Sequence, residues 1–459
     1  MTGSLIPAAV TARLERRGRL PFAFGTRFFI VLLLGLFWLV PAWWSSQFIV
    51  VMFVWDALAL IFWLVDLSRL PAPTDLEARR IWTAPLSLSV SASVTVELDA
   101  PPRASLQTLL VDETPVSLRG EPPQVSSLVP ARVTYDIVPR TRGNHTLGKL
   151  YVRYRTSLGL AERWAVANLS QTIRVLPSIE QARQNALYLI RSRQVEMEKR
   201  RKRQRGQGRE FETLREYRQG DDLRDMCWTA TARRHQLTTK IFQTERSQSV
   251  WVILDAGRLL RAQVTAQDRP FPVQKLDYAV DAALSVAQVA SQSGDKVGLI
   301  AYGRSVQQSV GLGRGPQHIR TLLDSLSLVK AEASEANHAR AVRTLMTAQN
   351  RRSLILWITD FAETATTPEV IEYAMHLTRR HLVVLAAVTQ PDLNALAWAI
   401  PQTEEEMFRH AAALEIAERR ERLLRRLRDR GVLTLDLPAG NLVTALVNQY
   451  LEIKDRSLL

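Results

Sequence analysis

Two long apolar segments near the N-terminus limit what this chain can fold into. Residues 28–44 read FFIVLLLGLFWLVPAWW, and residues 48–65 read FIVVMFVWDALALIFWLV. Each segment is close to the roughly 20 apolar residues that cross a bilayer as a helix. Only three residues separate them. We therefore predict a two-helix transmembrane hairpin, with spans at about 28–44 and 48–65, inside a first region of residues 1–70.

Arginines lie on both sides of this hairpin, whereas the connecting loop carries no charge. Basic residues near the ends of membrane helices tend to stay in the cytoplasm, so both termini are predicted to be cytoplasmic. A cleaved signal peptide is the alternative. The second apolar segment, and the lack of a small-residue cleavage site after the first, weigh against it. The flanking arginines are Arg13, Arg16, Arg17, Arg19, Arg27, Arg69, Arg79 and Arg80.

One acidic residue, Asp56, lies in the middle of the second apolar segment. A charged carboxylate at the bilayer centre costs roughly 3 kcal/mol, so intramembrane acids usually face another helix or serve a function. Two interpretations stay open. Asp56 either takes part in helix association or proton transfer, or is a tolerated residue that faces the partner helix.

The next region, residues 80–178, has the pattern of β-structure. Residues 88–98 alternate apolar and polar side chains, and clusters of Pro, Gly and Asn separate the later short runs. Such spacing predicts an antiparallel β-sandwich. The region holds no nucleophile motif and no glycine-rich phosphate loop, which favours a binding or spacer module over a catalytic one.

Residues 179–207 have the composition of a basic helical linker and end in KRRKRQR at 199–205. The chain carries 60 Lys and Arg against 45 Asp and Glu. A basic run of this kind is a solvated helix face, a contact with anionic lipid, or a contact with nucleic acid. Because no nucleic-acid-binding motif accompanies it, no specific nucleic acid is expected as a partner.

The rest of the chain alternates buried-strand runs with helical segments, which predicts a doubly wound α/β domain. Predicted strands include residues 249–255, 296–302 and 353–360. Two of them end in Asp255 and Asp360. If these strands are neighbours, both carboxylates point into one crevice, where a divalent cation such as Mg²⁺ is a chemically suitable ligand. Capping of the following helices is the alternative role for both residues.

A segment of mixed charge and aromatic residues precedes this domain. We call residues 208–234 the signature segment. Its arginines and carboxylates lie close enough in sequence to form ion pairs, and its aromatic residues would cover them. It is either a structural strap or a docking surface for a partner. The residues singled out are Glu210, Arg215, Glu216, Tyr217, Gly220, Asp221, Asp222, Arg224, Trp228 and Arg233.

This segment resembles the pattern of a bacterial family of MoxR-associated, von Willebrand factor A-like membrane proteins, which is catalogued as a domain of unknown function. Further matching positions are Phe211, Leu214, Ala232 and Glu245. The resemblance implies that residues 208–459 combine the signature segment with a von Willebrand factor A-like domain. It also implies a bacterial inner-membrane location.

The same resemblance implies a metal site of the form D-x-S-x-S, but the sequence departs from that form. The matching stretch here is DAGRL from Asp255, so both serines are missing and Arg258 adds a positive charge. Asp255 and Asp360 together make a degenerate site. No cofactor is expected, and Mg²⁺ remains conceivable only at an incomplete site.

These observations favour a membrane-anchored, non-enzymatic adaptor that binds protein partners. The resemblance implies a MoxR-type AAA+ ATPase as one partner, in the assembly or maturation of an unknown client protein. The alternatives are a metal-dependent hydrolase that uses Asp255 and Asp360, or a basic protein that binds lipid or nucleic acid. No Walker A motif, nucleophile elbow or histidine cluster supports an enzyme.

Overall fold

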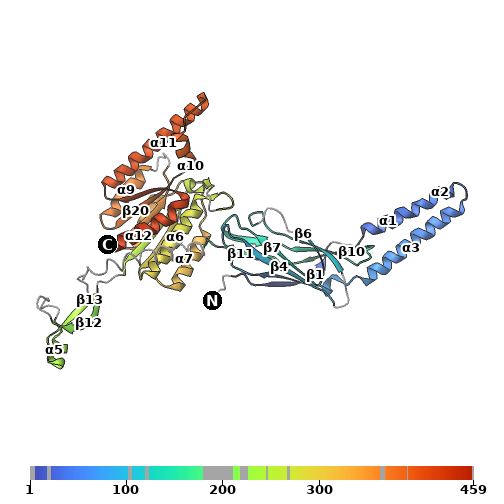
Figure 1. Ribbon diagram of the computed structural model, residues 1–459, viewed down its shortest axis with the longest axis horizontal. Coiled ribbons are helices and arrows are strands. Elements are labelled where there is room, and N and C mark those ends of the chain that lie inside the picture. Colours follow the sequence, from blue (N-terminus) through green and yellow to red (C-terminus); the bar gives the residue numbers. More distant parts are fainter. Residues whose placement is uncertain are drawn as a thin grey trace. The chain divides into compact units, whose positions relative to one another are not determined.

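The computed structural model describes residues 6–17, 22–101, 106–118, 124–178, 210–217, 226–243, 247–265, 269–361, 367–389 and 391–456 (Figure 1). The chain divides into two compact units, Met1–Ser178 and Ile179–Leu459. Each unit is described by itself. The basic linker predicted at 179–207 lies outside the described residues, and so does the basic run at 199–205.

The first unit is built on a nine-stranded, barrel-like antiparallel sheet. Its strand order is β6-β5-β9-β10-β1-β3-β4-β7, and β2 pairs with β10 off this path. The strands are β1 (Val10–Arg16), β2 (Phe22–Phe24), β3 (Glu77–Trp82), β4 (Ala92–Asp99), β5 (Leu106–Asp112), β6 (Gln124–Val129), β7 (Ala131–Ile137), β9 (Leu150–Arg155) and β10 (Ala161–Ala167). A separate pair joins β8 (Gly143–Leu147) to β11 (Gln171–Val175).

Strict alternation of side chains explains why these segments form strands. Along β7 every second residue is buried and the others are exposed, which places one face on the core. The core of the unit is a single cluster that includes Leu14, Val94, Leu98 and Val152. Leu14 comes from β1, so the strand that precedes the apolar helices belongs to the same core as the strands that follow them.

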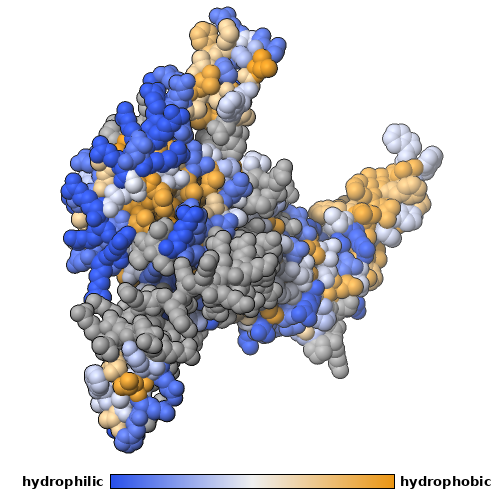
Figure 2. Space-filling view, turned by 60° about the vertical axis from the view of Figure 1, so that its left-hand side comes forward, coloured by the Kyte–Doolittle hydropathy of each residue, from blue (hydrophilic) through white to orange (hydrophobic). Residues whose placement is uncertain are grey.

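The apolar helices leave this sheet after β2 and return to it before β3. The first limb consists of α1 (Thr26–Gly35), a 3-10 turn (Leu36–Trp38) and α2 (Leu39–Ala42), and the second limb is α3 (Gln47–Arg69). Their side chains are largely exposed, with Phe37 at 73% and Phe53 at 64%. Orange, apolar surface covers this pair of limbs in Figure 2. Exposure of this kind distinguishes α3 from a core helix of a soluble protein.

The second unit contains a six-stranded mixed sheet of order β18-β17-β14-β19-β20-β21. Five strands are parallel: β14 (Ser249–Asp255), β17 (Lys296–Tyr302), β19 (Leu354–Thr359), β20 (Leu382–Thr389) and β21 (Leu433–Pro438). The edge strand β18 (Val306–Gly313) runs antiparallel to β17. A two-residue pair, β15 (Gln263–Val264) with β16 (Val273–Gln274), precedes the first helix.

Helices cover both faces of this sheet (Figure 1). One face packs against α8 (His338–Ala348), α9 (Thr367–Thr378) and α11 (Glu404–Asp429), through a core that includes Trp251 and Trp357. The helices α6 (Lys275–Gln292), α7 (Pro316–Leu328) and α12 (Leu442–Asp455) form a second packed group. The short helix α10 (Pro391–Trp398) packs against α11.

The described part of the signature segment and the strand that follows it form a small β-hairpin, which we call the signature hairpin, with a helix between its strands. β12 (Glu210–Glu216) pairs antiparallel with β13 (Thr238–Gln243), and α5 (Trp228–Arg234) lies between them. His235 ends this helix in the left-handed conformation, with φ at 55°. Backbone bonds from Tyr217 to Leu237 and from Cys227 to Thr238 close the hairpin, at 2.8 Å each.

The predicted fold class is wrong. Among the described residues, α3 and its continuation to Asp75 form the one helix long and apolar enough to cross a membrane, so a two-helix transmembrane hairpin is not found. The β region is one barrel-like sheet that includes β1 and β2, not a separate sandwich after the membrane segment. The α/β sheet is mixed and is not the predicted doubly wound, von Willebrand factor A-like domain.

Each error has a physical reason. In β1 the apolar residues Val10, Ala12 and Leu14 alternate with polar ones, and the arginines of this strand were interpreted as a membrane flank. β18 is an edge strand of intermediate and exposed residues, so it lacks the apolar run by which buried strands are found. The first apolar segment is interrupted by the 3-10 turn at Leu36–Trp38, which leaves its helices short.

Candidate functional site

The carboxyl ends of β14 and β19 bring the two predicted acidic residues together. The strands are parallel neighbours, with Leu254 opposite Ile358, so Asp255 and Asp360 leave the sheet side by side. Asp255 is 4% exposed and Asp360 is 8% exposed. The crevice expected from the sequence is therefore a buried position, and its chemistry depends on which groups the carboxylates contact.

Asp255 is held by neutral donors. Its Oδ1 accepts the backbone N–H of Gly257 at 2.7 Å, and its Oδ2 accepts the hydroxyl of Thr359 at 2.6 Å. A side chain at position 257 would collide with Ala336 and Asp255, which explains the glycine there. Burial raises the pKa of Asp255 to about 6, although the hydrogen bonds from Thr359 and Gly257 oppose that rise.

Asp360 is held by two cations that come from distant helices. The ammonium of Lys275, at the start of α6, donates to Oδ2 at 2.6 Å. The guanidinium of Arg420, from the second half of α11, contacts Oδ1 at 2.8 Å. The backbone N–H of Phe361 also donates to Oδ1, at 2.7 Å. Both carboxylate oxygens of Asp360 are thus engaged within the domain.

Arg420 extends this ion pair into a network. Its Nε and Nη2 both donate to Asp436 on β21, at 3.0 and 2.7 Å from Oδ1, and its Nη1 also reaches the carbonyl of Phe361 at 2.8 Å. Burial by itself would lower the pKa of Arg420, but the carboxylates of Asp360 and Asp436 raise it above its ordinary value. We call Lys275, Asp360, Arg420 and Asp436 the ionic network.

A second buried chain of hydrogen bonds lies at the neighbouring strand end. Trp357 Nε1 donates to the hydroxyl of Tyr302 at 2.8 Å, and that hydroxyl lies 2.9 Å from Nδ1 of His338. Burial raises the pKa of Tyr302 well above its ordinary value and lowers that of His338 to about 4. His338 is therefore neutral at physiological pH, and this chain of bonds is a packing element rather than a proton relay open to solvent.

The residues at this edge do not fit a magnesium ion. The ammonium of Lys275 and the guanidinium of Arg420 lie against the oxygens of Asp360 that an ion would use. Ala256, Gly257 and Arg258 offer no side-chain oxygen. No group of three or more His, Cys, Asp or Glu that could hold a metal occurs among the described residues. The two aspartates are brought together, but as parts of a protein-internal network.

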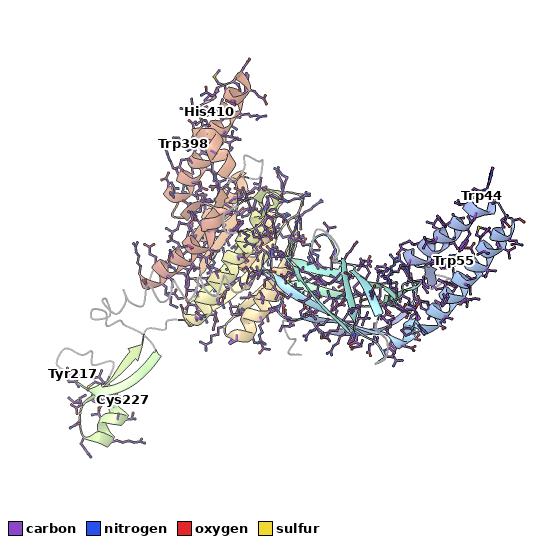
Figure 3. The ribbon with its side chains drawn as sticks, turned by 45° about the vertical axis from the view of Figure 1, so that its right-hand side comes forward. Trp44, Trp55, Tyr217, Cys227, Trp398 and His410 are labelled. Atoms are coloured by element: carbon purple, nitrogen blue, oxygen red, sulfur yellow. The ribbon has the colours of Figure 1, made fainter. Side chains whose placement is uncertain are left out.

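The signature residues are described only in part. Gly220, Asp221, Asp222 and Arg224 lie outside the described residues, and for Glu210 and Arg215 the structure describes the backbone of β12 alone. Tyr217 and Cys227 are labelled in Figure 3, close to the turn of the hairpin. Trp228 is 66% exposed at the start of α5, and Arg233 and Glu216 are exposed as well. The exposed tryptophan is a surface feature of this hairpin.

A cluster of hydrogen bonds holds the C-terminal end of α3 against the sheet of the first unit. Asp66 is completely buried, and its Oδ2 accepts the backbone N–H groups of Leu160 and Ala161 at 2.9 Å each. Its Oδ1 accepts the hydroxyl of Thr156. Arg163 and Tyr154 donate to carbonyl groups at the end of the helix, among them that of Pro71. The apolar helix is therefore tied to β10 by hydrogen bonds as well as by packing.

Asp56 lies where α3 meets α1. A side chain at Gly35 on α1 would come within 2.8 Å of Asp56 Oδ1, so the glycine allows the two helices to approach closely. This buried oxygen has no hydrogen-bond partner among the described residues. The neighbouring Trp55, labelled in Figure 3, donates to the carbonyl of Val31 on α1 at 2.9 Å. Asp56 thus faces the adjoining apolar limb.

The sequence did not identify the residues that decide the chemistry of this site. Lys275 and Arg420 are 85 and 60 residues from Asp360 along the chain, and no local motif links them to it. Asp66 gave a weak signal, since it is an acid at the end of an apolar helix. Arg80 was counted as a membrane-flanking charge, yet it is fully buried and paired with Asp112 inside the β sheet.

Comparison with known proteins finds a family to which the central region is similar. Residues 213–421 match the family model described as "Protein of unknown function DUF58". This part of the chain is thus similar to the DUF58 family, and we call it the DUF58-like region. The match starts in β12 and ends in α11, so it includes Asp255, Lys275, Asp360 and Arg420. The first unit lies outside it.

Curated relatives agree with this assignment. An uncharacterized protein of Mycobacterium tuberculosis is 27% identical over 158 residues, which cover 34% of this chain and 48% of the relative. The uncharacterized protein YeaD of Bacillus subtilis is 23% identical over 205 residues, which cover 44% of this chain and 47% of the relative. The chain thus spans about half the length of the curated relatives it matches.

Solved structures offer only remote likeness. An uncharacterized membrane-spanning protein of Vibrio fischeri shares 14% identity, with 45% of this chain and 98% of that chain covered and a TM-score of 0.16. Proximal thread matrix protein 1 of the mussel byssus shares 11% identity, with coverage of 44% and 46% and a TM-score of 0.27. Neither likeness carries an argument about the DUF58-like region.

Proposed function

We propose that this chain is a membrane-anchored adaptor that binds protein partners and catalyses no reaction itself. The observation that carries the proposal is the closed ionic network. Both acidic residues at the strand ends are neutralised or covered by groups of the same domain, and Asp360, Lys275 and Thr359 are each less than a tenth exposed. A substrate would have to displace these groups, so exposed surfaces are the better candidates for function.

The anchor in this proposal is the apolar region of the first unit. β1 precedes this region and β3 follows it, and the two strands pair antiparallel, with Thr11 opposite Arg79. In this proposal both strands lie on the same side of the membrane that the apolar region enters. We place that side in the cytoplasm of a bacterial cell, because Arg27 and Arg69 flank the helices there.

The partner in this proposal follows from the resemblance of the signature segment. A MoxR-type AAA+ ATPase is the expected partner, and a client protein awaiting assembly or maturation would be the second.

A co-purification experiment tests the adaptor proposal. The full chain is extracted in mild detergent and incubated with the MoxR-type ATPase of the source genome, in a variant that binds ATP without hydrolysing it. We expect a stable complex that a chain lacking residues 208–459 does not form. If the ATPase is not retained under these nucleotide conditions, the adaptor proposal in this form is refuted.

A metal-dependent hydrolase is not supported by any specific contact at the strand ends. An enzyme of that class needs an open coordination position for substrate or water. At Asp360 that position is taken by Lys275 Nζ at 2.6 Å. We therefore propose that the DUF58-like region works without a metal cofactor.

A further inference from the structure

Among the described residues of the second unit, the start of α11, the end of α10 and the loop between them carry the most exposed apolar side chains. Trp398 is 87% exposed, Ile400 82%, Phe408 70% and Met407 60%. Figure 2 shows orange side chains gathered among blue ones at this end of the helix, and Figure 3 labels Trp398 and His410 there. We call Trp398, Ile400, Met407 and Phe408 the apolar tip.

The apolar tip is not explained by packing in the described structure. The buried residues of α11 are Ala413, Leu424 and Leu427, so its first nine residues bury no side chain. Exposed apolar residues continue from the tip along one face, because Met407, Ala411 and Leu414 follow the i, i+4, i+7 spacing of a helix. A surface of this composition marks an interaction site more often than a solvated helix face.

The tip is also held in a defined shape. The carbonyl of Leu396, at the end of α10, lies 3.0 Å from Nδ1 of His410 on α11. At the start of α11 the hydroxyl of Thr403 accepts the N–H of Glu406 at 3.2 Å, and the carboxylate of Glu406 accepts the N–H of Gln402 at 2.7 Å. This reciprocal capping fixes where the helix begins and which way Met407 and Phe408 point. A preorganised surface loses less entropy when it binds.

The charge beside the tip decides what it can bind. The first turn of α11 consists of three exposed glutamates, Glu404, Glu405 and Glu406. Of the three, Glu405 forms an ion pair with Arg409, at 2.6 Å. An anionic lipid surface would be repelled by these carboxylates, whereas helices that lie on membranes carry Lys and Arg on their polar face. A symmetric contact with a second copy would bring the two sets of glutamates together. A partner with basic residues around an apolar patch complements the tip instead.

We propose that the apolar tip is the docking surface for the protein partner of this DUF58-like region. The matching element on the partner is an apolar helix or groove bordered by Lys and Arg. This inference rests on the proposed adaptor function and assigns a surface to it. The tip and the signature hairpin are separate surfaces, and each presents an exposed tryptophan, so a comparison between them distinguishes the two.

The test measures binding of the MoxR-type ATPase to the full chain in detergent micelles. We expect the Trp398→Ser/Phe408→Ser variant to raise the dissociation constant at least about tenfold, since buried aromatic anchors usually dominate an interface. The Glu404→Gln/Glu405→Gln variant should weaken binding about threefold at low salt and less at high salt. The matched control is Trp228→Ser, which removes another exposed tryptophan, 66% accessible, from the hairpin and should leave the affinity within about twofold.

The outcomes separate the inference from the function on which it rests. If the wild-type chain binds the ATPase and the tip variant binds equally well, the docking surface is wrong and the adaptor function stands. If the wild-type chain does not bind, both fail. Loss of vesicle binding or of self-association in the tip variant, with ATPase binding unchanged, would reassign the tip to lipid or to a second copy and overturn the inference. Unchanged far-ultraviolet circular dichroism shows that the variants fold.

Discussion

Replacing Lys275 by methionine tests the ionic network most directly. The ammonium donates to Asp360 Oδ2 at 2.6 Å and lies 3.4 Å from the carbonyl of Val388. The lysine side chain is 2% exposed and that of Asp360 is 6% exposed. Methionine keeps the length and most of the apolar volume of lysine but removes the charge. The variant therefore leaves a buried carboxylate with one cation instead of two.

The expected cost follows from this burial. Removal of one partner from a buried ion pair costs about 3–5 kcal/mol, because the remaining charge is left uncompensated. Arg420 still contacts the other oxygen of Asp360 at 2.8 Å, so we expect the lower end of that range, about 3 kcal/mol. In a domain of this size such a loss lowers the melting temperature by about 6–12 °C.

A double-mutant cycle distinguishes the charge from the packing. Asp360→Asn alone leaves Lys275 buried without its carboxylate and should also destabilise the domain. The Lys275→Met/Asp360→Asn variant removes both charges, so its cost should be smaller than the sum of the single costs by about 2 kcal/mol. Lys330→Met, at an exposed loop lysine, is the matched control and should change stability by less than about 0.5 kcal/mol.

The assay is differential scanning calorimetry of the full chain in detergent, because the two units are expected to unfold as separate transitions. Only the transition of the second unit should move in the Lys275 and Asp360 variants. Our reasoning would be refuted by a Lys275→Met variant within about 1 kcal/mol of the wild type. It would be refuted equally by strictly additive single and double substitutions, since these would show that the two charges do not interact.

Four further predictions concern other groups and Mg²⁺. The pKa of Asp255 is raised to about 6 from 3.8, so the folded state binds its proton more tightly than the unfolded state, and this residue lowers stability as the pH rises from about 4 to 6. Asp255→Asn should remove this dependence of stability on pH. It should also raise the free energy of unfolding at pH 7 by up to about 3 kcal/mol, measured by urea titration. His338, with its pKa lowered to about 4, acts with the opposite sign: its contribution is complete above pH 6.5 and is lost as the pH falls toward 4, so His338→Gln should flatten the acid limb of the same titration. Asp66→Ala should lower the free energy of unfolding of the first unit by about 2–4 kcal/mol, because it leaves two buried backbone N–H groups without an acceptor. The exposed control Ser68→Ala should leave this free energy unchanged. Addition of Mg²⁺ or of a chelator should leave the melting temperature of the second unit unchanged to within about 1 °C, and a clear rise with Mg²⁺ would contradict the fit of Lys275 at this edge.

Local patterns predicted the buried strands accurately. β14 and β17 begin and end at the residues expected from their apolar runs, 249–255 and 296–302. These strands are buried almost throughout, so the physical cause of the strand and the sequence signal are the same. β14 and β19 are parallel neighbours in the sheet. Their pairing places Asp255 and Asp360 together, as the sequence suggested.

Features that depend on distant contacts could not be predicted in this way. β1 carries two arginines, Arg13 and Arg16, and only its pairing with β3 and β10 reveals that it is a strand of the sheet. The second apolar segment is long enough to cross a membrane, but a 3-10 turn interrupts the first, and the amino-acid composition of that segment does not predict the turn. At the site, the decisive cations come from α6 and α11, and their approach to Asp360 depends on how the helices pack.

The ionic network also explains how one long helix can serve a surface role. α11 contributes Arg420, which is bound to Asp360 at the end of β19 and to Asp436 on β21. Phe408 lies twelve residues earlier on the same helix, a separation of about 18 Å along a rigid α-helix. Buried ion pairs contribute little net stability compared with apolar packing, but they specify one arrangement among several. The acidic strand ends therefore orient α11 and, through it, the apolar tip. If the tip is the docking surface that we propose, the edge of the sheet that suggested a metal site would serve binding by positioning that surface.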